Sequence, residues 1–249
     1  MAAETDGAVV RQILSEQLEK SEGVRAYERI CGTDHDEKQE ETMPYDYPAK
    51  SLDVQAQLMM FGLRPNHLML IGAFITAYGL FETTLERALW ALSERSIEGV
   101  RPFTEKMNTE AQFKMLRGGN PKLSDKCNSI LKVAGDAAED LNEYRNSLVH
   151  GYILSFGPDS VPSFMKNPHW HGASGRKKAV GDAYIDEPFQ DLVLIEAWNL
   201  FALVQEVEGV FAASDAQRAI EEMQDDISRA KSYASEARHL RSLMNHEKY

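Results

Sequence analysis

The stretch Leu68–Phe81, with the sequence LMLIGAFITAYGLF, is apolar around nearly its whole circumference. A helix with this pattern is buried on most of its sides. The run is 14 residues long, whereas about 20 are needed to cross a bilayer. We therefore expect a core helix over Pro65–Ser96. Its second half is amphipathic, because Leu85 and Leu89 alternate with polar positions such as Glu86 at helical spacing.

The composition agrees with a globular helical protein. The chain has 249 residues, is 43% hydrophobic and carries a net charge of −12. Residues 1–60 and 182–249 are acidic, whereas residues 61–181 carry a small positive excess. Two cysteines, Cys31 and Cys127, are too few for a disulfide framework, and the first residues lack the pattern of a signal peptide. We expect a cytoplasmic protein that does not enter a membrane.

The rest of the chain divides around this core helix. Residues 1–50 combine a helical pattern over 5–21 with an acidic linker that lacks periodicity. Residues 51–212 form the predicted all-α domain, with helices over 51–62, 108–116, 121–154 and 189–212. Proline and glycine interrupt the pattern over about 155–188, which predicts an inserted loop or small β-hairpin.

Residues 213–249 predict a single C-terminal helix. Its apolar positions recur at steps of four and three residues, which is a heptad pattern that packs on another helix, either within the chain or across a dimer. These positions are Ala216, Ile220, Met223, Ile227, Ala230, Ala234 and Ala237. Ser214 and Gln217 have the spacing of a capping box at its start.

The stretch Leu141–Ile153, LNEYRNSLVHGYI, carries the most specific chemistry. On a helix, Asn146 and His150 share a face, and Arg145 lies about 7.5 Å from His150 along the axis. The guanidinium is permanently charged and fits phosphate oxygens, and an imidazole exchanges protons near neutral pH. Together these groups suit phosphodiester chemistry.

Arg145-Asn146-x3-His150 resembles the R-x(4–6)-H motif of the HEPN superfamily, in which a polar residue follows the arginine. With Tyr152 included, it resembles the R-x4-H-x-Y form of HEPN toxins. The resemblance implies a HEPN-like helical bundle, here with extra N- and C-terminal helices and the insertion. It also implies a metal-independent endoribonuclease in which two domains pair across one cleft. RNA would be cleaved to 2′,3′-cyclic phosphate and 5′-hydroxyl ends, without a cofactor.

On this resemblance, His150 is the general acid–base, Arg145 stabilises the phosphate charge and Asn146 positions the site. Glu82 and Glu86, one turn apart on the core helix, are candidate supporting residues, because an acidic residue often neighbours the motif in the family. Tyr152 corresponds to a tyrosine that is adenylylated in toxins paired with nucleotidyltransferase antitoxins. A plain packing role at the helix end is the alternative for Tyr152.

Cations and an aromatic ring in the predicted insertion suit single-stranded RNA, whose bases stack on aromatic side chains. The candidate RNA contacts are Lys166, Trp170, Arg176, Lys177 and Lys178. His169 and His171 offer only two ligands, so we expect no metal site. The expected partners are RNA, a second copy of the chain and, in a toxin or phage-defence setting, an antitoxin or regulatory protein. The alternatives are a catalytically silent HEPN module for dimerisation or for binding a partner or nucleotide, and a purely structural polar network.

Overall fold

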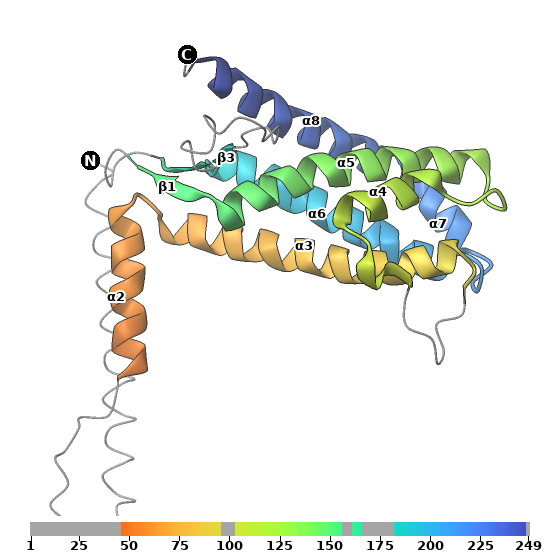
Figure 1. The fold of residues 1–249 in the computed structure, drawn as a ribbon, viewed down its shortest axis with the longest axis horizontal. Helices are drawn as coiled ribbons and strands as arrows, with labels where there is room; N and C mark the ends of the chain where they lie inside the picture. Colours follow the sequence, from red (N-terminus) through yellow and green to blue (C-terminus); the bar gives the residue numbers. More distant parts are fainter. Residues whose placement is uncertain (1–45, 96–102, 156–160, 166–181, 248–249) are drawn as a thin grey trace, which may run out of the picture. The chain divides into compact units, whose positions relative to one another are not determined.

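The computed structural model describes residues 46–95, 103–155, 161–165 and 182–247 (Figure 1). The chain divides into two compact units, Met1–Gln57 and Leu58–Tyr249. Of the first unit, the structure describes residues 46–57, which form most of helix α2 (Tyr47–Met60). No residue of α2 is buried. The observed division thus falls a few residues after the linker boundary expected near residue 50.

The second unit is all-α apart from one very small sheet, as predicted. Its elements follow the chain in the order α3 (Pro65–Leu92), the 3-10 helix η1 (Phe103–Lys106), α4 (Thr109–Gly118), α5 (Asp125–His150), β1 (Tyr152–Leu154), β2 (Ser163–Met165), β3 (Asp182–Tyr184), α6 (Glu187–Glu208), α7 (Ala216–Glu222) and α8 (Gln224–Glu247). The long helices α3, α5 and α6 lie side by side, and α8 packs on α5 and α6 (Figure 1).

Helix α3 is the predicted core helix. Pro65 occupies its first turn, where a missing backbone N–H costs nothing, and His67 Nδ1 accepts a hydrogen bond of 3.2 Å from the Arg64 backbone N–H. The helix stops at Leu92, four residues before the predicted end. There the Ser93 hydroxyl donates to the Leu89 carbonyl, and Glu94 adopts a φ of +51° that helical residues avoid.

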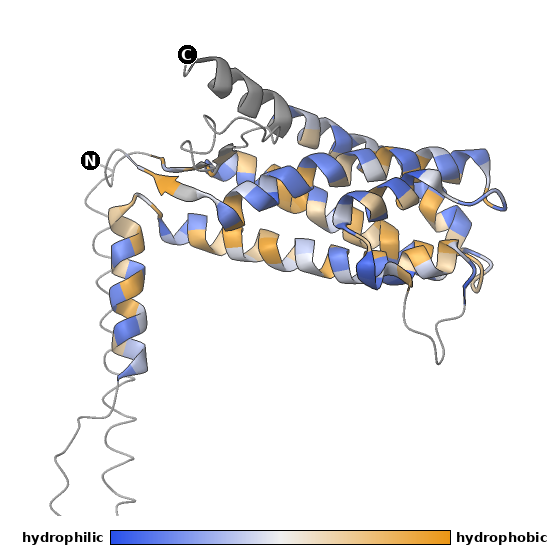
Figure 2. Ribbon diagram, in the orientation of Figure 1, coloured by the Kyte–Doolittle hydropathy of each residue, from blue (hydrophilic) through white to orange (hydrophobic). Residues whose placement is uncertain are grey.

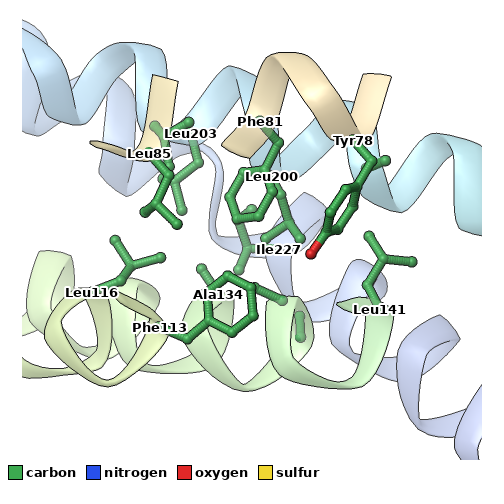
Figure 3. Close-up of a cluster of buried hydrophobic side chains, with 14 of the residues drawn as sticks. Tyr78, Phe81, Leu85, Phe113, Leu116, Ala134, Leu141, Leu200, Leu203 and Ile227 are labelled. Carbon is green, nitrogen blue, oxygen red and sulfur yellow. The ribbon is translucent and has the colours of Figure 1, made fainter. Parts of the chain in front are cut away.

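The core fills the space between α3, α4, α5 and α6 (Figure 3). The rings of Phe81 and Phe113 stack with centroids 6.2 Å apart and join α3 to α4. The rings of Phe74 and Tyr144 meet edge to face at 5.5 Å and join α3 to α5. Figure 3 shows Tyr78 at one end of the cluster, with its hydroxyl oxygen directed toward α5. The core therefore fixes the rotation of α3 against α5.

The predicted insertion contains an antiparallel sheet of three short strands in the order β1-β2-β3. Ile153 pairs with Phe164, which in turn pairs with Ala183. The buried side chain of Ala183 and the half-buried side chains of Ile153 and Phe164 pack on the helical core. The prediction of a loop or single hairpin was therefore incomplete, because β1 starts directly after α5, before the predicted insertion.

The prediction of one continuous C-terminal helix was wrong. The helix breaks at Met223 into α7 and α8, and the Ser214 capping box does not form because α7 begins at Ala216, after Asp215. Ile227, Ala230 and Ala234 of the heptad pattern are buried against the chain's own α5 and α6. Residues 213–247 therefore belong to the same compact unit as the bundle.

One helix of the described residues, α3, is long and apolar enough to span a membrane by length and composition alone. A core helix of a soluble protein passes the same test. Ten residues of α3 are buried in the bundle, which matches the expected role as a core helix.

Candidate active site

Helix α5 carries Arg145, Asn146 and His150 in its last two turns. The helix starts at the Ser124 cap, whose hydroxyl oxygen accepts a hydrogen bond of 3.1 Å from the Cys127 backbone N–H. The predicted start at Pro121 was therefore four residues early. The helix ends at His150, because Gly151 is extended, with φ −80° and ψ 161°. His150 thus stands at the junction of α5 and strand β1.

Three neighbours hold the Arg145 side chain, which is 29% exposed. Its Nη2 lies 3.6 Å from Glu82 Oε2 on α3, and its Nη1 donates to Asn146 Oδ1 at 3.0 Å. Its guanidinium carbon lies 5.7 Å from the centroid of the Tyr78 ring, within range of a cation–π interaction. The cation is therefore fixed in position, while part of its surface stays open to solvent.

Tyr78 supports this arrangement from inside the core. Its ring is 1% exposed, and its hydroxyl donates a hydrogen bond of 3.0 Å to Asn142 Oδ1 on α5. Burial raises the pKa of Tyr78, and the negative charge of Glu82 raises it further. The hydroxyl therefore stays protonated and remains a donor at neutral pH. Asn142 lies one turn before Asn146, so Tyr78 ties α3 to the face of α5 that carries the motif.

The Glu82 carboxyl balances the charge of Arg145. Partial burial raises the pKa of Glu82, and the nearby Arg145 acts in the opposite direction. The carboxyl is 32% exposed, so solvent screens this ion pair and weakens it. A phosphate group can therefore compete with Glu82 for the guanidinium.

His150 differs from Arg145 because its side chain is exposed. The last turn is closed by the backbone, where Gly151 N–H donates to the Ser147 carbonyl at 2.8 Å. Within the part of the chain that the structure describes, no hydrogen bond or ion pair holds the imidazole. The imidazole is therefore accessible from solvent.

The second candidate glutamate has a different partner. The Thr104 hydroxyl in η1 donates a short hydrogen bond to Glu86 Oε1 and accepts one of 2.7 Å from Trp90 Nε1. Glu86 therefore anchors η1 to α3. Of the two carboxylates, only Glu82 forms an ion pair with Arg145 among the interactions recorded for the described residues.

The remaining predicted site residues lie at or beyond the limits of the description. The backbone of Tyr152 lies in β1 opposite Met165. The predicted RNA contacts Lys166, Trp170, Arg176, Lys177 and Lys178 lie outside the described residues. No group of three His, Cys, Asp or Glu side chains that could hold a metal ion occurs in the described ranges.

The sequence analysis missed a second set of buried polar groups, behind Tyr78. Glu196 on α6 is fully buried, and among the described residues neither of its carboxyl oxygens has a hydrogen-bond partner. Burial raises the pKa of Glu196, with a further contribution from Asp140 and an opposing one from Lys231. Lys231 Nζ lies 2.9 Å from Asp140 Oδ2 and connects α8 to α5. A lone glutamate in the apolar run Leu192–Val204 was the signal available in the sequence.

The last two turns of α5 carry a fixed, half-exposed cation with an amide beside it and, five residues later and about 140° round the helix axis, an exposed imidazole. These groups can bind an anionic oxygen and transfer a proton. Comparison with known proteins adds no assignment, since no family model, no curated protein and no solved structure matches the chain.

Proposed function

We propose that this protein is a metal-independent endoribonuclease of HEPN type. The observation that carries the proposal is the placement of Arg145, which Glu82, Tyr78 and Asn146 hold in a half-exposed position two turns or less from the exposed His150. A phosphate needs a fixed cation, and an attacking hydroxyl needs a proton acceptor that can move. The two side chains meet these two needs.

In the proposed reaction, the RNA 2′-hydroxyl attacks the adjacent phosphorus and the 5′-oxygen leaves. An imidazole takes the proton from the 2′-hydroxyl or gives one to the leaving oxygen. Arg145 stabilises the negative charge that builds on the phosphate oxygens. The products are a 2′,3′-cyclic phosphate and a 5′-hydroxyl, so the reaction needs neither water nor a metal ion in this step.

The proposal includes a pair of chains. One chain supplies one Arg145 and one His150, whereas an acid and a base act on opposite sides of the phosphate. Two copies that face each other across one cleft would supply both. A cytoplasmic toxin or defence effector, restrained by an antitoxin or regulatory protein, is the biological setting that we propose.

A second candidate function follows from the contacts of Arg145. Glu82 and Tyr78 already contact the Arg145 guanidinium. These contacts also suit a catalytically silent module, in which the polar cluster only joins α3 to α5. This module would act in dimerisation or in binding a partner or nucleotide.

The test compares wild type, Arg145→Ala and His150→Ala with tRNA and total RNA in excess EDTA, followed by end-group analysis. Cyclic-phosphate ends from wild type alone, with all three proteins folded, support the ribonuclease. Absence of cleavage by folded wild type, together with a lower Tm of Arg145→Ala, supports the silent module. Equal cleavage by wild type and His150→Ala contradicts the assignment of His150.

A further inference from the structure

Helix α8 packs on α5 and α6 where Asp140 and Glu196 lie. Lys231 Nζ on α8 lies 2.9 Å from Asp140 Oδ2, and Asn199 Nδ2 on α6 donates a hydrogen bond of 3.5 Å to the Asp226 carbonyl on α8. Helices α6 and α8 run in opposite directions (Figure 1). Glu196 comes about one turn before Asn199, so it lies level with the turn of α8 that follows Asp226.

The apolar contact between α8 and the bundle is small. Among its described side chains, at residues 224–236, those that are buried are Ile227, Ala230 and Ala234. Hydrophilic residues predominate along this part of the helix (Figure 2). An alanine buries only one methyl group, and the stabilisation by burial increases with the apolar area. A hollow of about 210 Å³ also lies between α5 and α8, lined by Ile130 and Val133 on α5 and by Ile227 on α8. Apolar packing therefore holds this part of α8 only weakly.

The Glu196 carboxyl makes the attached position of α8 depend on a proton. The side chain is fully buried, and none of the described residues gives a hydrogen bond to either oxygen. Burial raises the pKa of Glu196, Asp140 raises it further and Lys231 opposes the shift. Because Lys231 already pairs with Asp140, an ionised Glu196 would leave two carboxylates to share one cation.

The other helices that pack on α6 supply no second cation to this carboxyl among the described residues. From α3, Tyr78 acts on it, but burial keeps the Tyr78 hydroxyl protonated and neutral. His67 and Arg87 of α3 pair with glutamates at the two ends of α6. On α7, Arg218 is 70% exposed and pairs with acidic residues of its own segment. The charge of Glu196 is therefore relieved either by a proton or by contact with water.

We propose that α8 is a proton-gated cover, which detaches from α5 and α6 when Glu196 ionises. Detachment brings the carboxyl into water, where its pKa returns to about 4.3, the ordinary value for glutamate. The open state therefore binds fewer protons than the attached state. Its population rises by up to about tenfold per pH unit above that value, until the pKa of the attached state is reached. Helices α3, α5 and α6 stay packed through their shared core, so the opening is local. This inference is independent of the proposed function.

The experiment follows hydrogen exchange of the full chain by mass spectrometry between pH 5 and pH 8. Exchange is expressed as protection factors, which removes the effect of pH on the intrinsic exchange rate. In wild type, peptides within residues 224–236 are expected to lose protection by up to about tenfold per pH unit. Peptides within residues 197–207 of α6 are expected to keep theirs. Constant protection of α8, or loss of protection in both sets together, would overturn the inference, since the second result shows unfolding of the whole bundle.

Glu196→Gln keeps the size of the side chain and removes its charge, so protection of α8 is expected to be constant from pH 5 to pH 8. Glu196→Met removes the charge without leaving a buried amide and is expected to behave in the same way. Glu206→Gln, on the same helix, is the control and is expected to retain the wild-type pH dependence of α8.

Helix α8 also carries His239 and His246, a residue type that titrates in this pH range. Both histidines are present in the Glu196 variants. A pH dependence of α8 that persists in Glu196→Gln and Glu196→Met would therefore assign the gate to other groups and overturn the role of Glu196.

Discussion

Arg145 and His150 lie in the same two turns of α5, but their surroundings differ. Arg145 is held by an ion pair, an amide and an aromatic ring, whereas the His150 side chain is exposed. A group that only binds charge gains from being fixed in advance, since its ordering cost is already met in the folded state. A group that transfers protons needs solvent access and a hydrogen-bond path. The two environments match the two proposed roles.

His150→Ala is expected to lower the rate of RNA cleavage by about 10²–10⁴-fold, the usual contribution of general acid–base catalysis. The exposed imidazole packs on little, so the Tm is expected to stay within about 1 °C of wild type, as for most surface substitutions. Single-turnover cleavage and differential scanning calorimetry measure the two effects. Val149→Ala, at the neighbouring exposed position, is the control and is expected to keep the wild-type rate.

Tyr78→Phe removes the hydrogen bond to Asn142 but keeps the ring under Arg145. This hydrogen bond is only partly buried, so its loss costs about 0.5–1.5 kcal/mol, the net value of a typical protein hydrogen bond. In a domain of this size we expect the Tm to fall by roughly 2–5 °C. Cleavage is expected to fall less than in His150→Ala, because the guanidinium remains in place. Tyr233→Phe on α8, where the ring is half-buried, is the matched control, and an equal loss in both variants would contradict the role of Tyr78.

At the scale of the elements, α5 depends on its two ends. The cap at Ser124 fixes the first residue of the helix. The last turn carries His150 at the junction with β1. The Ser124 hydroxyl caps the start and also donates a hydrogen bond of 2.7 Å to Glu221 Oε1 in α7. One side chain therefore fixes both the helix start and the contact between α5 and α7.

Ser124→Ala is expected to lower the free energy of unfolding by about 1–2 kcal/mol, since the cap and its link to α7 are lost together. Urea unfolding followed by circular dichroism measures the loss. Ser129→Ala makes the same substitution at an exposed position of the same helix and is expected to change stability by less than about 0.5 kcal/mol. Equal losses in the two variants would show that the cap contributes nothing.

At the scale of the whole molecule, the described helices enclose a carboxyl group, that of Glu196, to which none of their residues gives a hydrogen bond. Glu196 lies where α6 faces Tyr78 on α3, Asp140 on α5 and Lys231 on α8. Burial raises its pKa above the value in the unfolded chain, so the folded state binds the proton more tightly. The stability contributed by this proton is fully present below about pH 4.3, the ordinary pKa of glutamate, and is lost as the pH rises through the folded-state pKa.

Glu196→Gln is therefore expected to gain stability relative to wild type as the pH rises from 5 to 8, because the amide has no charge to bury. The measurement is the Tm difference between variant and wild type at each pH. Glu206→Gln, on the same helix with a half-buried side chain, is the control for the substitution itself. A difference for Glu196→Gln that is constant over this range would contradict a protonated Glu196.

The local sequence pattern determined which segments of this protein form helices. The apolar run in α3, the periodicity of α5 and α6 and the spacing of Arg145, Asn146 and His150 all depend on residues within a few turns of each other, and the helices followed. Some local signals are ambiguous. Pro121 and the Ser214 capping box predict helix starts, whereas in the structure Ser124 and Asp215 occupy those positions. Competing caps a few residues apart differ by only about 1 kcal/mol, which packing decides.

Only the tertiary structure decided which distant residues meet. Glu82 and Glu86 are one turn apart on the same face of α3. The rotation of α3 against α5 nevertheless places Glu82 beside Arg145, whereas Glu86 accepts a hydrogen bond from Thr104. The pairing of Tyr78 with Asn142 joins residues 64 positions apart. The burial of Glu196 requires four helices to converge. These contacts depend on the packing of complete helices. The apolar periodicity of one helix does not determine how the neighbouring helix is rotated about its own axis.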